Sequence, residues 1–209
     1  MASNRLYGPT IPPGPPGAIA LNTPGAGATP NALPITQSIT ATTDAMIETP
    51  GLTAVPLAVS IPPNSPLEGK RFQLVWSGVI ENAQSSTLTL KLWALATALS
   101  NTPASNTALG SSGAITAFTG KTNWWVLADL LFDSISGKLT GKVEFFANNT
   151  LVAAVAVSNV ITGINNVPVT SPPATTPAGV PILNFGLSVA SGTVTAANTL
   201  VLDDATINF

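Results

Sequence analysis

The carboxylates are the side chains of this chain best suited to chemistry, yet their spacing does not favour catalysis. Nine Asp and Glu residues are present, whereas histidine and cysteine are absent. The absence of histidine removes the commonest general base, the Ser-His-Asp arrangement and the usual zinc sites. Two carboxylates converging in a cleft, as in a glycosidase, remain open, but we expect each carboxylate to end a strand or face solvent. The sequence therefore predicts a protein that is not an enzyme and holds no cofactor.

Asp203 and Asp204 are the only two acidic residues that are adjacent in the sequence. Because neighbouring residues of a strand point to opposite faces, the two cannot grip one cation together. One of them could join a Ca²⁺ site with backbone carbonyls and Asp129 or Asp133, although no spaced acidic loop accompanies the pair. We expect a plain turn at this pair and no metal site.

The tryptophans are the other side chains that could bind a ligand. Trp93, Trp124 and Trp125, together with Tyr7, could form a platform on which sugars stack. The alternative places Trp125 in the core and Trp93 or Trp124 at a subunit interface, where aromatic residues are enriched. We favour the core or interface interpretation and keep Trp93 and Trp124 as candidate interface or glycan-binding residues.

The first 66 residues differ from the rest of the chain. They hold thirteen of the nineteen prolines and only three charged residues, Arg5, Asp44 and Glu48. Since proline is excluded from helix interiors and from central strands, residues 1–66 are expected to form a long extended arm. Ordering such an arm costs about 1–2 kcal/mol per residue, so we expect a partner surface to hold it. The arm residues expected to touch that partner are Tyr7, Pro12, Pro13, Pro15, Pro16, Ile19, Leu21, Leu33 and Ile35.

Residues 67–209 show the pattern of short strands and turns. Apolar and polar residues alternate in several short runs, which Gly, Asn and Ser clusters separate. This pattern predicts an all-β domain, an antiparallel and jelly-roll-like β-sandwich, with hairpin turns at 134–137 and 148–150 and a long loop over 100–116. The inner faces are expected to include Phe72, Trp76, Leu88, Leu90, Leu92, Trp125, Leu127, Val143, Phe145, Leu183, Phe185 and Ile207.

The charge content limits the possible partners. Charged residues make up 8% of the chain, against about 25% in an ordinary soluble domain. So weakly charged a surface favours association, and we expect a homo-oligomer, with a trimer favoured. The seven basic residues are scattered, whereas nucleic-acid binding needs them clustered. The most apolar windows, 124–132 and 151–157, are much shorter than the ~20 residues that span a bilayer, so we expect neither nucleic acid nor membrane as a partner.

The run from Trp125 to Phe145, WVLADLLFDSISGKLTGKVEF, resembles a pattern of tailed-bacteriophage virion proteins. In that pattern a Trp-x-Leu strand leads through a Ser/Gly turn into a strand that contains glycine. Segments 87–92 and 198–207 resemble its other elements. The resemblance implies a jelly-roll-like structural domain of a phage particle, most like a head decoration or cement protein, which clamps neighbouring major capsid proteins and is often a trimer.

These expectations combine into two hypotheses. In the first, the chain stabilises the assembled capsid from its outer surface, after assembly in the host cytoplasm, and residues 1–66 anchor it to the major capsid protein. In the alternative, it is a carbohydrate- or receptor-binding module of a tail fibre or baseplate, with Trp93, Trp124 and loop 100–116 as the binding site.

Overall fold

The computed structural model describes residues 34–39, 42–49, 54–61, 71–96, 101–133, 138–161, 183–192 and 198–208. All strand pairings in these ranges are antiparallel, and no α-helix occurs among them. The prediction of an all-β antiparallel sandwich is therefore confirmed. The elements are β1 (Ile35–Ile39), β2 (Ala45–Met46), β3 (Val59–Ile61), β4 (Arg71–Ala94), the 3₁₀ turn η1 (Pro103–Ser105), β5 (Thr107–Ser111), β6 (Ile115–Asp133), β7 (Lys138–Ala147), β8 (Thr150–Val160), β9 (Leu183–Ser191) and β10 (Asn198–Asn208).

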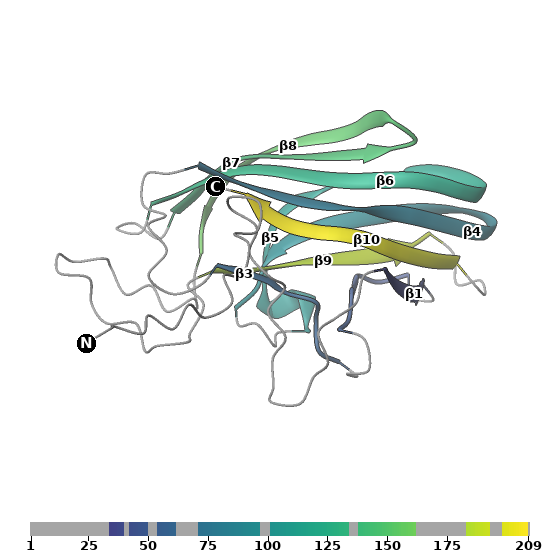
Figure 1. The fold of residues 1–209 in the computed structure, drawn as a ribbon, viewed down its shortest axis with the longest axis horizontal. Helices are drawn as coiled ribbons and strands as arrows, with labels where there is room; N and C mark the ends of the chain where they lie inside the picture. Colours follow the sequence, from purple (N-terminus) through teal and green to yellow (C-terminus); the bar gives the residue numbers. More distant parts are fainter. Residues whose placement is uncertain are drawn as a thin grey trace, which may run out of the picture.

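The first layer of the sandwich is a sheet with the strand order β1-β10-β4-β6-β7-β8. The first half of β4 is its central strand, since residues 73–81 pair with β10 and residues 71–82 pair with β6. Strands β6, β7 and β8 follow as a meander, and β8 forms one end of the sheet (Figure 1).

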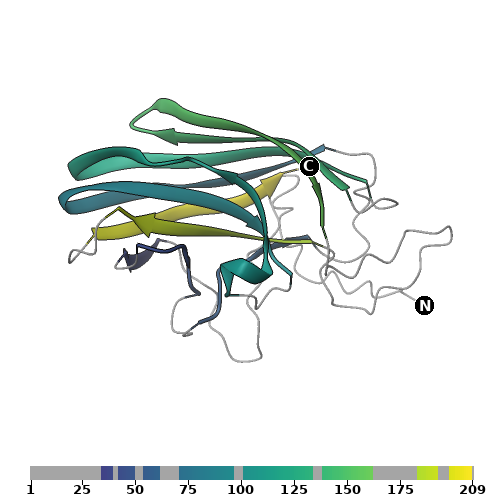
Figure 2. The same cartoon turned by 180° about the vertical axis from the view of Figure 1, so that it is seen from behind.

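The second layer is built on the last residues of β4. Residues 88–94 of β4 pair with β9, residues 91–94 pair with β5, and β9 in turn pairs with β2 and β3. Strand β4 thus runs from one layer into the other, and its register is irregular between Asn82 and Leu88 (Figure 2). The Asn82 amide bridges this irregular stretch, because it donates hydrogen bonds to the carbonyls of Ser86 and Phe118.

The core lies between the layers and contains ten of the twelve residues predicted for it. Trp125 and Leu127 are the exceptions: they are half-buried and lie on the opposite face of β6. Both faces of β6 are apolar, so hydrophobicity alone does not select between them. The neighbouring strands do, because residues directly opposite each other share a face. Buried Trp76 and Phe145 both stand opposite Val126, which directs the even-numbered residues of β6 inward.

The predicted boundary at residue 66 is wrong for the described residues 34–39, 42–49 and 54–61, because these belong to the sandwich. Strand β1 pairs with β10, with Ile35 opposite Leu202, while β2 and β3 pair with β9. Ile35 is 4% exposed and contacts its own chain, so it is not available as an arm contact. The other predicted arm contacts, from Tyr7 to Leu33, lie outside the described residues.

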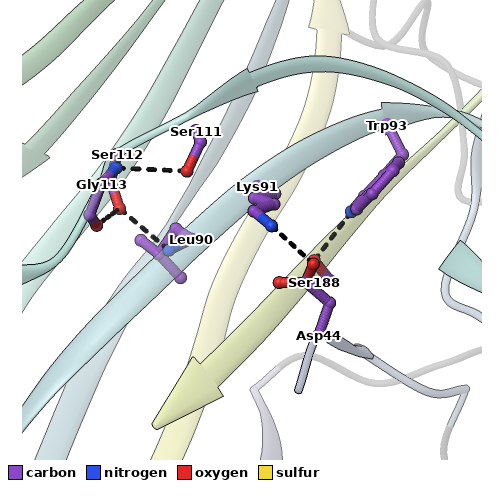
Figure 3. A network of polar contacts seen from close by, with 8 residues as sticks. All are labelled: Asp44, Leu90, Lys91, Trp93, Ser111, Ser112, Gly113 and Ser188. Carbon is purple, nitrogen blue, oxygen red and sulfur yellow. Dashed lines mark hydrogen bonds and ion pairs between the residues drawn. The ribbon is translucent and has the colours of Figure 1, made fainter. Parts of the chain in front are cut away.

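Polar contacts fix the added strands to the rest of the domain. The Gln37 amide donates to the Met46 carbonyl over 3.2 Å and accepts from the Glu48 backbone N–H over 2.8 Å. Lys91 of β4 forms an ion pair with Asp44 at 2.6 Å, seen in Figure 3 just before β2 begins. These contacts connect segment 42–49 to both layers.

Three local predictions had different outcomes. The hairpin turn at 148–150 is confirmed: Asn148 and Asn149 have φ of 49° and 57°, the left-handed pair of a two-residue turn. The predicted loop 100–116 is wrong in part, because it contains η1 and β5. Asp203 and Asp204 form no turn; they lie in β10 at a register shift, where a bulge accommodates one extra residue.

Candidate interaction surface

Trp93 and Trp124, the two predicted interface or glycan-binding aromatics, are both buried within the chain. Trp124 is 1% exposed and faces the core, with Gly78 and Ala147 opposite it. Trp93 is 8% exposed, and its Nε1–H donates to the hydroxyl of Ser188 over 2.7 Å (Figure 3). A sugar or a partner needs an open ring face, so this burial contradicts the predicted role of both residues.

The tryptophan that does reach the surface is Trp125. Its ring stacks on that of Phe146, with the centroids 4.7 Å apart and the planes 12° from parallel. The two residues are directly opposite each other on β6 and β7, and both are half-buried on the outward face of the first layer. An aromatic pair of this kind contributes about 0.5–1.5 kcal/mol beyond its area burial.

A β-bulge extends this apolar surface onto β8. Phe145 stands opposite Ala153, and Phe146 stands opposite Leu151, so Val152 is an extra residue in β8. Leu151 is 49% exposed and Val152 36% exposed beside the aromatic pair. We call Trp125, Phe146, Leu151 and Val152 the aromatic patch. It lies where β7 and β8 approach the Asn148-Asn149 turn.

The charged residues of the same face are paired with one another. Arg71 lies 3.2 Å from Asp129, Lys142 lies 2.9 Å from Glu144, and Lys121 lies 3.5 Å from Glu81. Exposed pairs of this kind contribute little stability, with a median of about 0–1 kcal/mol. Their effect here is to leave the outward face locally neutral around the aromatic patch.

The described residues provide no metal site. They contain no cluster of three or more acidic, histidine or cysteine side chains that could hold a metal ion. No helix among them is long and apolar enough to cross a membrane. The feature of the described surface that could bind a ligand is the apolar aromatic patch. It lies on a face whose backbone is held by the β-sheet.

The aromatic patch was not predicted, although the sequence carries a signal for part of it. Asn148-Asn149 is a two-residue hairpin turn, so Ala147 must stand opposite Thr150 and Phe146 opposite Leu151. Counting back from this turn would have placed two large apolar residues side by side. Nothing in the sequence indicates the stacking of Phe146 on Trp125, which depends on the β6–β7 register.

Comparison with known proteins assigns no family. No family model matches the chain, and no curated protein matches it. A structure of infectious bursal disease virus, Gt strain, aligns with a TM-score of 0.24 and 14% identity over 92% of this chain and 37% of that chain. A structure of the Gx strain aligns with a TM-score of 0.21 and 12% identity over 93% of this chain and 46% of that chain. This chain thus spans less than half the length of either viral chain, and TM-scores this low do not show a shared fold.

Proposed function

We propose that this chain is a non-enzymatic structural protein of a virus particle, most like a decoration protein of a tailed bacteriophage, which binds the assembled capsid and stabilises it. The observation that carries the proposal is the aromatic patch. It combines a stacked Trp125–Phe146 pair with exposed Leu151 and Val152 on an otherwise charge-paired sheet face. Aromatic anchors on a rigid surface are typical of protein interfaces.

The resemblance to phage virion proteins supports the same function. It includes residues 125–145, which cover the second half of β6 and most of β7, residues 87–92 of β4, and residues 198–207 of β10. The Trp-x-Leu strand of that pattern is the one that presents Trp125 outward. The residues that carry the resemblance therefore include a main component of the aromatic patch.

Stabilisation of the capsid follows from mass action. A protein that binds only the assembled shell stabilises it by about 2.7 kcal/mol per site when its free concentration is 100 times the dissociation constant. The partner is the major capsid protein, met on the outer surface of the shell. The Pro-rich residues 1–33 are the anchor, because a sequence with proline-restricted dihedrals loses less entropy when it docks, and its backbone can add to a free strand edge.

The experiment that tests this proposal is binding to capsids that lack the chain. Full-length protein is mixed with decoration-free capsids of the phage that encodes it, and the pellet is assayed after sedimentation through sucrose. We expect saturable binding and a higher disassembly temperature of the capsid. Trp125→Ser with Leu151→Ser should lower the affinity at least tenfold, whereas Thr119→Ala, an exposed change on β6, should leave it unchanged. Absence of binding by the unaltered protein would overturn the proposal.

The alternative function, a carbohydrate- or receptor-binding module of a tail fibre or baseplate, now depends on the Trp125–Phe146 pair, because Trp93 and Trp124 are buried. A glycan array probed with the full chain separates the two functions. A glycan signal that disappears in Trp125→Ser, with no capsid binding by the unaltered protein, would favour the alternative.

A further inference from the structure

Strand β8 is an unpaired end of the first layer. Its eleven residues, Thr150–Val160, pair with β7 on one side, and no other described strand pairs with it. Figures 1 and 2 show β8 as the outermost strand of the sheet in both views. A row of backbone N–H and C=O groups therefore points away from β7 along this edge.

The sequence of β8 offers this edge little protection against pairing with another strand, although the Ser158 N–H donates to the Asn159 Oδ1 over 3.2 Å. Natural edge strands are commonly blunted by lysine, by proline or by inward-pointing charges. The sequence TLVAAVAVSNV contains no charged residue and no proline, and its single bulge lies near one end. Val160, at the other end, is 56% exposed. The strand has the composition of one that is covered in the functional state.

Strand β5 approaches β8 without closing its edge. A Cβ atom added to Gly110 of β5 would lie 3.3 Å from Phe145 Cε2 and 3.4 Å from Val155 Cβ. Since Phe145 is a core residue, this places β5 against the inner face of β7 and β8. The contact at the far end is one side-chain hydrogen bond, from the Asn159 amide to the Ala108 carbonyl at 3.0 Å.

We propose that the edge of β8 pairs with β8 of a second copy of this chain, antiparallel, about a two-fold axis at Val155. The two first layers would then form one continuous sheet across the dimer. Val155 is the midpoint of β8. Residues opposite each other in an antiparallel pair share a face of the sheet. In a pair of identical strands, each residue must therefore face a residue of the same parity. The two-fold axis then lies where one residue faces its own equivalent, and not between two successive residues. This association does not depend on the proposed role in a virion.

The charges on β7 favour this register, although Lys142 Nζ also lies 2.9 Å from the Glu144 carboxylate of its own chain. Glu144 stands opposite Ala154, and Lys142 stands opposite Ala156. With Val155 on the axis, Ala154 faces Ala156 of the partner subunit. A row of four residues, side by side on adjacent strands, then crosses the dimer from Glu144 through these two alanines to Lys142 of the partner subunit. Only small alanine side chains lie between these opposite charges. Charge complementarity of this kind fixes register and favours the self-partner.

The neighbouring registers bring like charges together. If Ala154 were on the axis, its row would run from Glu144 to Glu144 of the partner subunit. If Ala156 were on the axis, its row would run from Lys142 to Lys142 of the partner subunit. The backbones of these like-charged residues are three strand spacings, about 14 Å, apart, so the repulsion is weak, but it favours the register centred on Val155 over both neighbours. A strand of unrelated sequence would meet no such complementary row, which is why the second copy is the proposed occupant.

Cysteine cross-linking tests both the contact and its register. The chain contains no cysteine, so each introduced thiol is unique. Full-length Val155→Cys and the double variant Ala154→Cys with Ala156→Cys are oxidised mildly and analysed on a non-reducing gel. One of these two facing pairs must be the closer, non-hydrogen-bonded kind, because the two kinds alternate along an antiparallel ladder. We expect a disulfide-linked dimer from at least one of them, at protein concentrations where the unaltered chain sediments as a dimer.

Ala154→Cys alone is the matched control. In the proposed register its nearest equivalent is a diagonal neighbour about 7–8 Å away, too far for a disulfide, so it should stay monomeric on the gel. Efficient linking of this control would overturn the Val155 register. The β8 contact itself would be overturned if the unaltered protein stayed monomeric at all concentrations. It would also be overturned if the protein formed a dimer or a trimer that neither test variant links. Circular dichroism spectra that match the unaltered protein establish that each variant is folded.

Discussion

Strands β8 and β9 are alike in composition and opposite in their surroundings. Neither contains a charged residue, and both are rich in Val, Leu, Ala and Ser. Every residue of β9 is buried, whereas β8 exposes Leu151, Val152 and Val160. The difference lies in the neighbours: β9 has β4 on one edge and β2 and β3 on the other, while β8 has β7 alone among the described strands.

The neighbours of β9 come from the N-terminal part of the chain. The Ile47 N–H donates to the Leu187 carbonyl over 2.8 Å, and the Leu57 N–H donates to the Ile47 carbonyl over 2.7 Å. A segment that precedes the rest of the sandwich in sequence thus covers an uncharged strand near the end of the chain. Strand β9 is therefore covered on both edges by its own chain, whereas the second neighbour that we propose for β8 is another copy of this chain.

The largest expected effect comes from removing the cover of β9. Deletion of residues 1–61 removes six large buried apolar side chains that contribute about 1.5–3 kcal/mol each, or roughly 9–18 kcal/mol together, which is as large as the 5–15 kcal/mol that stabilises a typical domain. These side chains are Ile35, Ile39, Met46, Ile47, Leu57 and Val59. We expect this variant to lack a cooperative thermal transition. Deletion of residues 1–33, the matched control, should retain one, because the described strands begin at Ile35. Cooperative unfolding of the variant that lacks residues 1–61, at the midpoint temperature of the unaltered protein, would contradict the account.

The next largest effect separates the two faces of β6. Trp124→Ala opens a core cavity and should cost about 3–5 kcal/mol in urea unfolding. Trp125→Ala loses the half-buried stack on Phe146 and should cost about 0.5–1.5 kcal/mol. Trp124→Phe is the control: the buried Trp124 Nε1–H has no described hydrogen-bond partner, so its removal sacrifices no bond. Equal costs for the two alanine variants would show that the assigned faces are wrong.

A smaller effect is expected where β9 meets the end of β4. Ser188→Ala removes the acceptor of the Trp93 indole N–H, at 2.7 Å, and leaves that donor buried. The free energy of unfolding should fall by about 1–3 kcal/mol. The double variant Trp93→Phe with Ser188→Ala lacks both polar partners. Ser188→Ala should therefore lower the free energy of unfolding markedly less in the Trp93→Phe background than in the unaltered protein. Strict additivity of the two changes would mean that the hydrogen bond contributes nothing.

The alternation of apolar and polar residues predicted strands in the second half of the chain, apart from the turn wrongly expected at Asp203-Asp204 within β10, and the Asn148-Asn149 pair was sufficient to predict the hairpin turn between β7 and β8. The alternation pattern failed where strand register or strand length, and not hydrophobicity, decides the structure. β6 is apolar on both faces, so only the register with β4 and β7 shows that Trp124 is buried and Trp125 is not. Strands β2 and β3 have two and three residues, too few for a periodic signal, and the prolines around them concealed their place in the sheet.

The smallest expected effect concerns the charges that favour the β8 register. Glu144→Lys places like charges at the ends of the rows that cross the proposed dimer, so the dimer dissociation constant should rise roughly two- to fivefold at low salt, and less at high salt. The exchanged pair, Lys142→Glu with Glu144→Lys, restores opposite charges and should restore the affinity. Sedimentation equilibrium measures both. Failure of the exchanged pair to recover affinity would remove the electrostatic basis for the register.

Hydrogen exchange of the β8 amides at different protein concentrations tests most directly that this strand is covered by a second copy. The amides of residues 150–160 that point away from β7 should exchange quickly in dilute protein and become protected in step with the dimer population as concentration rises. The amides of β9 should be protected to the same degree throughout, because the chain itself supplies their cover. The account would be contradicted if the amides on the outer edge of β8 still exchanged quickly in the concentrated dimer. It would also be contradicted if they exchanged slowly in the isolated monomer.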